Sequence, residues 1–159
     1  MISRKISDLR TCLVASPDYI AKYGTPKNEM ELSQHRQIAL RFLNGKYSTW
    51  QFNQDGVSHP FTFSNKVLTL TDTEAVTQLA LAGQGIAKVP MYLAWEHLQV
   101  GRLKLVLEDS FDSGNFELAL QYPHRTLVTP RVRVVIDYLL EKLAEIEGLY
   151  IGEKELKKL

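Results

Sequence analysis

Cysteine and long apolar runs are both scarce in this sequence. Cys12 is the single cysteine among 159 residues, which excludes an internal disulfide and indicates a reducing compartment. No stretch approaches the roughly 20 consecutive apolar residues that a membrane-spanning helix needs. The first ten residues carry charge without a following apolar run, which is not the pattern of a secretory signal peptide. These absences predict a cytoplasmic protein with no membrane partner.

An excess of charge of one sign is also missing. Nineteen Lys and Arg residues stand against eighteen Asp and Glu residues, which gives a net charge of +1. A nucleic-acid-binding surface usually shows a basic patch or stripe, and this balance indicates none. The apolar share of 45% and the charged share of 23% are typical of a globular chain. The length predicts one domain, or one unit with two lobes.

The sequence lacks the usual motifs of catalysis and metal binding. Its four histidines are not spaced like metal ligands, either from one another or from Cys12. They are His35, His59, His97 and His124. A G-x-S-x-G nucleophile elbow is absent. The glycine pair at residues 83–85 follows a predicted helix, whereas a phosphate-binding loop precedes one. We therefore predict no metal, no cofactor and no catalytic residue. A small α/β enzyme is kept as an alternative that a turnover dependent on Cys12 or His35 would support.

What the sequence does contain is an alternation of strand-like and helix-like segments. Strands are predicted at residues 9–14, 37–42, 47–53, 57–63, 67–70, 85–89, 103–107 and 116–122, and helices at 17–23, 29–35, 71–82, 90–98 and 130–147. The last helix carries apolar residues at three- and four-residue spacing, which is typical of an amphipathic helix. Strands that alternate with helices predict an α/β fold with a mainly parallel sheet covered on both faces.

Residues 69–90 are the most informative segment. Thr71 and Glu74 have the spacing of a capping box, in which each side chain satisfies a backbone amide at the start of a helix. Gly83 is suited to the left-handed turn that ends such a helix. A helix that begins at the end of a parallel strand directs free N–H groups beyond the sheet edge. The segment therefore predicts a seat for a small anionic or polar ligand.

Several short motifs occur in the order found in one family. Together they resemble the effector-binding domain of LysR-type bacterial transcriptional regulators, and the resemblance covers residues 8–147. The motifs are Leu13 to Ile20, Tyr23-Gly24-Thr25-Pro26, Glu31-Leu32 with His35, Trp50-Gln51-Phe52 with Gly56, Thr71-Asp72, Ala82 to Ala87, Val89-Pro90, Gly101-Arg102-Leu103, Tyr122-Pro123, Pro130 to Arg133 and Ile136 to Leu139.

The resemblance implies a two-lobed fold of the periplasmic-binding-protein type, with a small-molecule cleft between the lobes. It assigns residues 1–7 to a leader, 8–115 to the second lobe, 116–147 to a crossover strand and long helix of an incomplete first lobe, and 148–159 to a charged tail. It also implies that the chain is N-terminally truncated. Contact with DNA would then be made only through a helix-turn-helix domain missing from this chain.

Four residues are the candidates for effector binding. Thr71 matches the cleft-facing helix start of the family, although a purely capping role explains it equally well. Thr73 comes from the same turn. Ser16 is predicted to cap the helix that follows the first strand, and is a further candidate for the cleft. Arg41 could pair with a carboxylate, or could be an ordinary surface arginine.

Three functions therefore remain open. The first and preferred one is a ligand-sensing regulatory domain. The second is a non-sensing fragment that acts only through oligomerisation, because an incomplete lobe would leave residues 116–122 and helix 130–147 partly uncovered, and exposed apolar area favours self-association. The third is the small enzyme named above.

Overall fold

The structure is a computed structural model that describes residues 1–123 and 128–159, so His124 lies outside the described part. The helices are α1 (Pro17–Tyr23), α2 (Glu29–Leu32), α3 (Thr73–Leu81), α4 (Met91–Gln99), α5 (Pro130–Ala144), α6 (Glu153–Leu156) and the 3-10 turn η2 (Glu147–Leu149). The strands are β1 (Ile2–Leu9), β2 (Thr11–Ala15), β3 (Gln37–Leu40), β4 (Gln51–Gln54), β5 (Val57–Pro60), β6 (Lys66–Leu70), β7 (Ile86–Pro90), β8 (Lys104–Leu105) and β9 (Phe116–Tyr122).

A five-stranded sheet in the order β6-β3-β7-β2-β8 forms the centre of the molecule. Strand β3 is parallel to both β6 and β7. Strand β2 is antiparallel to β7 and to β8, so β8 runs in the same direction as β7. Four of the five strands therefore share one direction, which confirms the predicted α/β fold with a mainly parallel sheet.

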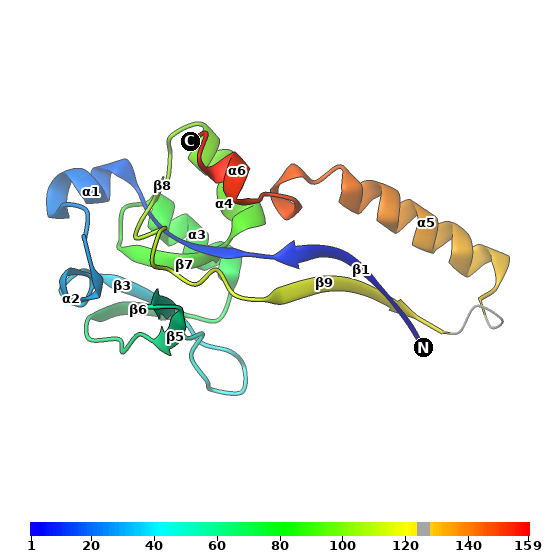
Figure 1. The fold of residues 1–159 in the computed structure, drawn as a ribbon, viewed down its shortest axis with the longest axis horizontal. Helices are drawn as coiled ribbons and strands as arrows, with labels where there is room; N and C mark the ends of the chain where they lie inside the picture. The colour runs from blue at the N-terminus through cyan, green and yellow to red at the C-terminus, as the bar shows by residue number, and fades with distance from the viewer. Residues whose placement is uncertain (124–127) are drawn as a thin grey trace.

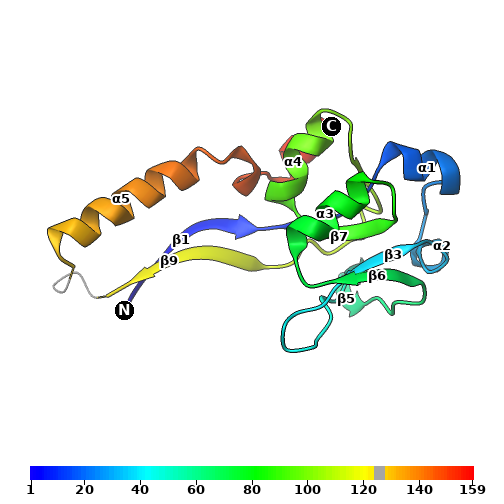
Figure 2. The same ribbon diagram turned by 180° about the vertical axis from the view of Figure 1, so that it is seen from behind.

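One face of the sheet is covered by α3 and α4. Figure 2 shows both helices beside β7. Val76 and Ala80 of α3 and Trp95 of α4 pack with Val14 and Val89, which point from the strands toward the helices. Full burial of each valine side chain contributes about 1.5–3 kcal/mol, so this cluster is a main source of the stability of the sheet.

The opposite face is covered by an aromatic cluster. Leu13 and Ala15 of β2 point to it, because successive side chains of a strand alternate between faces. Trp50 and Phe61 stack with ring centroids 5.7 Å apart, and Phe52 meets Phe61 edge to face. The cluster is held by the β4–β5 hairpin, whose turn is the predicted Asp-Gly turn, with positive φ at residues 55 and 56.

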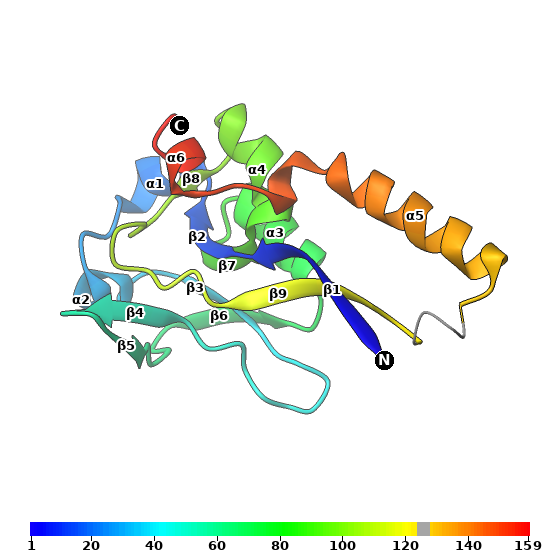
Figure 3. The same ribbon diagram turned by 45° about the vertical axis from the view of Figure 1, so that its right-hand side comes forward.

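A two-stranded ribbon leads away from the central sheet. Strands β1 and β9 pair antiparallel, with a register shift between Lys5 and Ser7. Figure 1 shows this ribbon extending from the sheet, with α5 running alongside it, and Figure 3 shows β1 leading directly into β2. Among the described residues no third strand pairs with the ribbon.

The two chain ends differ from the sequence-based interpretation. Residues 1–7 are not a separate leader segment, because residues 2–9 form β1 and pair along β9. The charged tail is partly structured as well: Leu149 and Ile151 are buried, and Ile151 joins the cluster under α4. The long helix ends at Ala144 rather than at residue 147. Strand β1 was missed because a strand of mainly polar residues shows little pattern in the sequence, and only its pairing with β9 identifies it.

The start of α3 also requires a correction. The N-cap is Asp72, whose Oδ2 accepts a hydrogen bond from the Ala75 N–H at 2.8 Å. Thr71 lies one residue earlier and is exposed, so the predicted Thr71–Glu74 capping box is wrong. A carboxylate cap also interacts favourably with the partial positive charge of the helix start. Both a threonine and an aspartate were acceptable caps here, and only the chain path at the end of β6 selects the aspartate.

This correction predicts a difference between two neighbouring alanine variants. Asp72→Ala should lower the free energy of unfolding by about 1 kcal/mol, because the Ala75 amide loses its acceptor. Thr71→Ala should change it by less than about 0.5 kcal/mol, as expected for an exposed residue. Urea denaturation of both variants measures the difference. A larger loss for Thr71→Ala than for Asp72→Ala would contradict the assignment of the cap.

Candidate functional site

A cavity of about 510 Å³ lies where the central sheet meets the ribbon. It opens at the carboxyl ends of β3 and β7, which is the edge where ligands bind in open α/β sheets. Its apolar lining consists of Leu40, Phe42, Tyr47, Val89, Pro90 and Phe116, and its polar lining includes Thr11, Ser48, Thr49, Gln51, Thr73, Lys88 and Asp112. A predominantly apolar wall with a few polar groups is typical of a small-molecule site.

Lys88 of β7 brings a cation into this cavity. Its Nζ donates a hydrogen bond to the Thr49 carbonyl oxygen at 2.7 Å. Burial lowers the pKa of the Lys88 ammonium below its ordinary value of 10.5, while the charge of Asp112 acts in the opposite direction. An ammonium that has lost part of its hydration gains from an anionic partner. The cavity therefore contains a cation suited to a carboxylate ligand.

Asp112 places a carboxylate in the same cavity, and its orientation is set by two hydrogen bonds. The Ser58 hydroxyl donates to Oδ2 at 2.8 Å, and the Gly114 N–H donates to Oδ1 at 2.9 Å. Both donors come from the protein, so the carboxylate is held in place before any ligand arrives. A hydroxyl or amine of a ligand could donate to it, whereas a second anionic group would be repelled.

The cavity also contacts both chain segments that join the sheet to the ribbon. Thr11 begins β2, and its N–H and Oγ1 both donate to the Ser113 carbonyl oxygen, at 2.9 and 3.1 Å. Ser113 lies just before β9. A ligand in the cavity would therefore touch the point at which the two crossing segments are joined.

The structure brings only one of the four predicted residues to this cavity. Thr73, the first residue of α3, lines it. Thr71 and Arg41 are exposed and are not among the described residues that line it. Arg41 instead forms an isolated bridge with Tyr47 just beyond β3. Thr73 is thus the one predicted residue that lies at this cavity.

Ser16 lies at the other end of β2. Its predicted capping role is confirmed, since Oγ accepts a hydrogen bond from the Tyr19 N–H at 3.1 Å. Ser16 is buried beside Gly83, whereas the cavity is at Thr11, the start of the same strand. Because β2 runs antiparallel to β7, the helix that follows β2 begins at the sheet edge away from the cavity.

Sequence reasoning missed Lys88 and Asp112. Lys88 did carry a signal, since it is a lone charge within the apolar strand β7, between Ala87 and Val89. A charged side chain in such a strand has to point out of the apolar core, and the side to which it points is often a functional site. Asp112 lies in a polar connection that had no distinguishing pattern, and only the folded chain brings it to the cavity.

The groups weighed for catalysis have other roles. Cys12 is buried, and burial raises the pKa of its thiol to about 12. It is therefore a neutral thiol, not an activated nucleophile. His35 is held by the Tyr19 hydroxyl, which lies 2.8 Å from Nδ1 and accepts from the Arg36 N–H.

Within residues 1–123 and 128–159, no three His, Cys, Asp or Glu residues are grouped to hold a metal ion. No helix in the described part of the chain is long and apolar enough to cross a bilayer.

Comparisons with known proteins define the class. The family model described as "LysR substrate binding domain" matches residues 1–144. The regulator CrgA of Neisseria meningitidis serogroup C is 33% identical over 143 residues, covering 89% of this chain and 46% of the relative. The uncharacterised regulator YcaN of Escherichia coli is 30% identical over 132 residues, covering 82% of this chain and 42% of the relative. The solved regulatory domain of the meningococcal CrgA superposes with a TM-score of 0.74 at 29% identity, over 89% of this chain and 68% of that domain.

These matches mark the fold as that of a transcriptional regulator's regulatory domain. The chain belongs to the LysR substrate-binding-domain family, as the ordered motifs predicted. It spans less than half the length of the curated relatives named above.

The contact between Tyr19 and His35 predicts an acid-sensitive step in stability. Burial lowers the pKa of His35 below its ordinary 6.5, and Glu31 opposes this shift. Between the folded-state pKa and the unfolded-state pKa of His35, the unfolded chain binds more protons than the folded one. The contribution of neutral His35 to the free energy of unfolding is therefore fully present above pH 6.5 and is lost as the pH falls through the folded-state pKa. The variant His35→Asn keeps an acceptor near the position of Nδ1 but does not titrate. We expect its Tm to fall less than that of the unmodified chain when the pH is lowered from 7.5 to about 5. Equal losses in both proteins would contradict this assignment.

Proposed function

We propose that this chain is the ligand-sensing regulatory domain of a LysR-type regulator, with its effector bound in the cavity at the carboxyl ends of β3 and β7. The observation that carries the proposal is the placement of Lys88, Asp112 and Thr73 around one mainly apolar cavity. The volume of about 510 Å³ lies in the range of small-molecule sites. We further propose a cytoplasmic protein, consistent with the single cysteine.

The chemistry of the lining supports a particular class of effector. A carboxylate of the ligand would pair with the Lys88 ammonium, which has one hydrogen bond to the Thr49 carbonyl and further N–H groups to donate. The apolar body of the ligand would lie against side chains such as Val89 and Phe116. A hydroxyl or amine at its other end would donate to Asp112. The effector proposed is therefore a small monocarboxylate with an apolar body and a hydrogen-bond donor.

Sensing would act through the two crossing segments. Thr11 and the start of β9 both line the cavity, and the ribbon is attached to the sheet at this point. A ligand that binds one angle between sheet and ribbon more tightly than others shifts the population toward that angle. The curated relatives are named as HTH-type transcriptional regulators. We propose that this shift serves transcriptional control, with DNA contacted by a helix-turn-helix domain outside this sequence.

Thermal shift with a panel of small aliphatic and aromatic monocarboxylates tests the proposal. A ligand at 100 times its Kd stabilises the folded state by about 2.7 kcal/mol, which is readily measured as a rise in Tm. We expect Lys88→Met to lower the affinity for a stabilising carboxylate at least about tenfold, since a charge-assisted hydrogen bond contributes about 1.5–3 kcal/mol. Thr73→Val should weaken the same ligand less, because it removes only a neutral hydrogen bond.

The matched control is Lys104→Met on the exposed edge strand β8. It makes the same change of charge and size away from the cavity, and should leave affinity unchanged. If Lys88→Met and Lys104→Met weaken binding equally, the ligand site lies elsewhere. If no compound in a broad metabolite panel raises Tm, the result counts against sensing and favours the alternative, a non-sensing chain that acts only through oligomerisation.

A further inference from the structure

The C-terminal segment of the chain returns from the ribbon to the central sheet. We call residues 147–156 the strap, which contains the 3-10 turn η2 and helix α6. Figure 1 shows the strap leading from the end of α5 onto α4. The family model matches residues 1–144, so the strap lies beyond the matched part. The family match therefore assigns it no role.

Close packing fixes the strap to α4. Leu149 and Ile151 are only 7% and 6% exposed, and Ile151 and Leu156 pack against the apolar cluster that α4 shares with the sheet. Gly148 brings the backbone of the strap against the backbone of α4, because a Cβ added to Gly148 would lie 2.8 Å from the Tyr92 Cα. A side chain could enter there only if one of the two backbones moved. The strap is therefore docked on α4 at a defined position.

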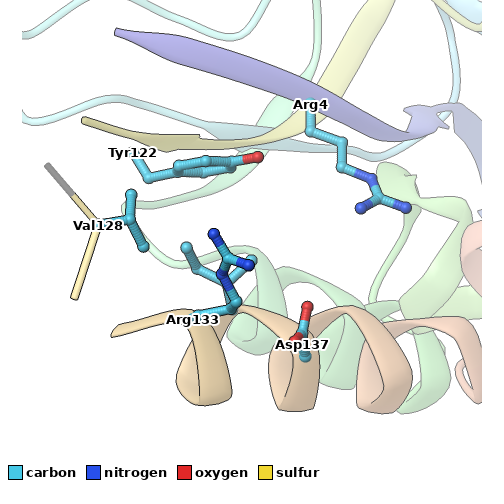
Figure 4. A pocket seen from close by; sticks show the side chains of 6 residues that line it. Arg4, Tyr122, Val128, Arg133 and Asp137 are labelled. Carbon is cyan, nitrogen blue, oxygen red and sulfur yellow. The ribbon is translucent and has the colours of Figure 1, made fainter. Parts of the chain in front are cut away.

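The helix that precedes the strap has no apolar core of its own. No described side chain of α5 is buried. Arg133 and Asp137 extend from α5 toward the strands, and Arg4 and Tyr122 extend from the strands toward α5 (Figure 4). These side chains surround a polar hollow of about 330 Å³. A polar hollow supplies little of the apolar burial that holds elements together, so the position of α5 depends on how its ends are attached. The strap is the attachment at its C-terminal end.

The strap meets the ribbon where β1 is irregular. The register between β1 and β9 shifts between Lys5 and Ser7, and an irregularity of this kind bends a strand. Ile6 and Ser7 of β1 line one hollow of about 470 Å³ together with residues 149–152 of the strap. The turn η2 lies beside both β1 and α4. The strap therefore connects the bend of the ribbon to the central sheet.

We propose that the strap fixes the angle between the ribbon and the central sheet. The contact between Thr11 and Ser113 joins the two parts at one point, and a single junction beside a bend leaves the ribbon free to turn. The strap adds a second fixed point on α4, so that one angle is held. Release of the strap would free α5 and the ribbon together. This role does not depend on ligand sensing, since the strap contains none of the residues that line the cavity.

A distance measured between two spin labels tests the proposal. Gln78→Cys in α3 and Val134→Cys in α5 place the labels at exposed helix positions, and the buried, neutral thiol of Cys12 does not take up label. Double electron–electron resonance on labelled chains diluted with unlabelled ones reports the distance within one chain. We expect one narrow distance distribution. Adding Gly148→Ala should broaden it at least about twofold, because a two-stranded ribbon without support is only marginally stable.

Gly152→Ala is the matched control within the strap. The nearest atom to its added Cβ would be Glu155 Oε2 at 3.1 Å, the end of a flexible side chain. Neither Gly148 nor Gly152 has a positive φ that alanine would strain. The control should therefore keep the narrow distribution.

Leu149→Asp releases the strap by a different route, because it places a carboxylate at a buried position. It should broaden the distribution as Gly148→Ala does. Far-UV circular dichroism checks that each variant is folded, and if Leu149→Asp is not, Gly148→Ala decides alone. A folded Leu149→Asp or Gly148→Ala variant with the unmodified distribution would overturn the proposal, as would equal broadening in Gly152→Ala.

Discussion

The burial of β2 on both faces is the constraint on which the rest of this structure depends. Val14 packs under α3 and α4, and Leu13 packs into the aromatic cluster on the other side. Strand β2 also runs against the direction of its neighbours. Its start is therefore placed at the carboxyl ends of β3 and β7, where the ribbon joins the sheet and where the cavity lies. A slip of one residue would exchange its two faces and remove both clusters from the core.

The two parts of the molecule differ sharply in how well they are packed. The central sheet has helices on one face and aromatic rings on the other, so it is a complete three-layer unit. The ribbon and α5 enclose a polar hollow instead of a core. A two-stranded ribbon alone is only marginally stable in water, so the ribbon depends on its connection to the central sheet. The contact between Thr11 and Ser113 joins the stable part to the weaker one, and the cavity lies at that junction.

The solved relative is matched only in part. The solved CrgA regulatory domain is matched over 68% of its chain, and the elements that lack cover here are those of the ribbon and α5. The cavity is lined by residues of the central sheet, of the loop at residues 42–49, of β4 and α3, and of the segment from Asp112 to Phe116, the first residue of β9. Most of these residues lie on or beside the central sheet, and only Phe116 belongs to the ribbon. The cavity therefore belongs mainly to the well-packed part of the molecule.

Much of the fold was predictable because local chemistry and tertiary structure agree. Ser16 followed by Pro17 begins α1, Asp55-Gly56 closes the hairpin, and Pro130 begins α5, each as expected. The ordered motifs identified the family. The failures share a cause. β1 is a polar strand that is stable only against β9, and the cap of α3 depends on how β6 ends, which selects Asp72 over Thr71.

The candidate site, like the fold, was predictable from the sequence only in part. Sequence by itself determined the family, the α/β class, the capped helix after β6 and the amphipathic pattern of α5, because these follow from spacing along the chain. Tertiary structure decided which side chains meet. It brought Lys88, Asp112 and Thr73 to one cavity and placed Ser16 at the opposite sheet edge. It also left apolar side chains of α5 exposed. Such choices depend on strand direction and on what covers each face, and neither is encoded in any short stretch of residues.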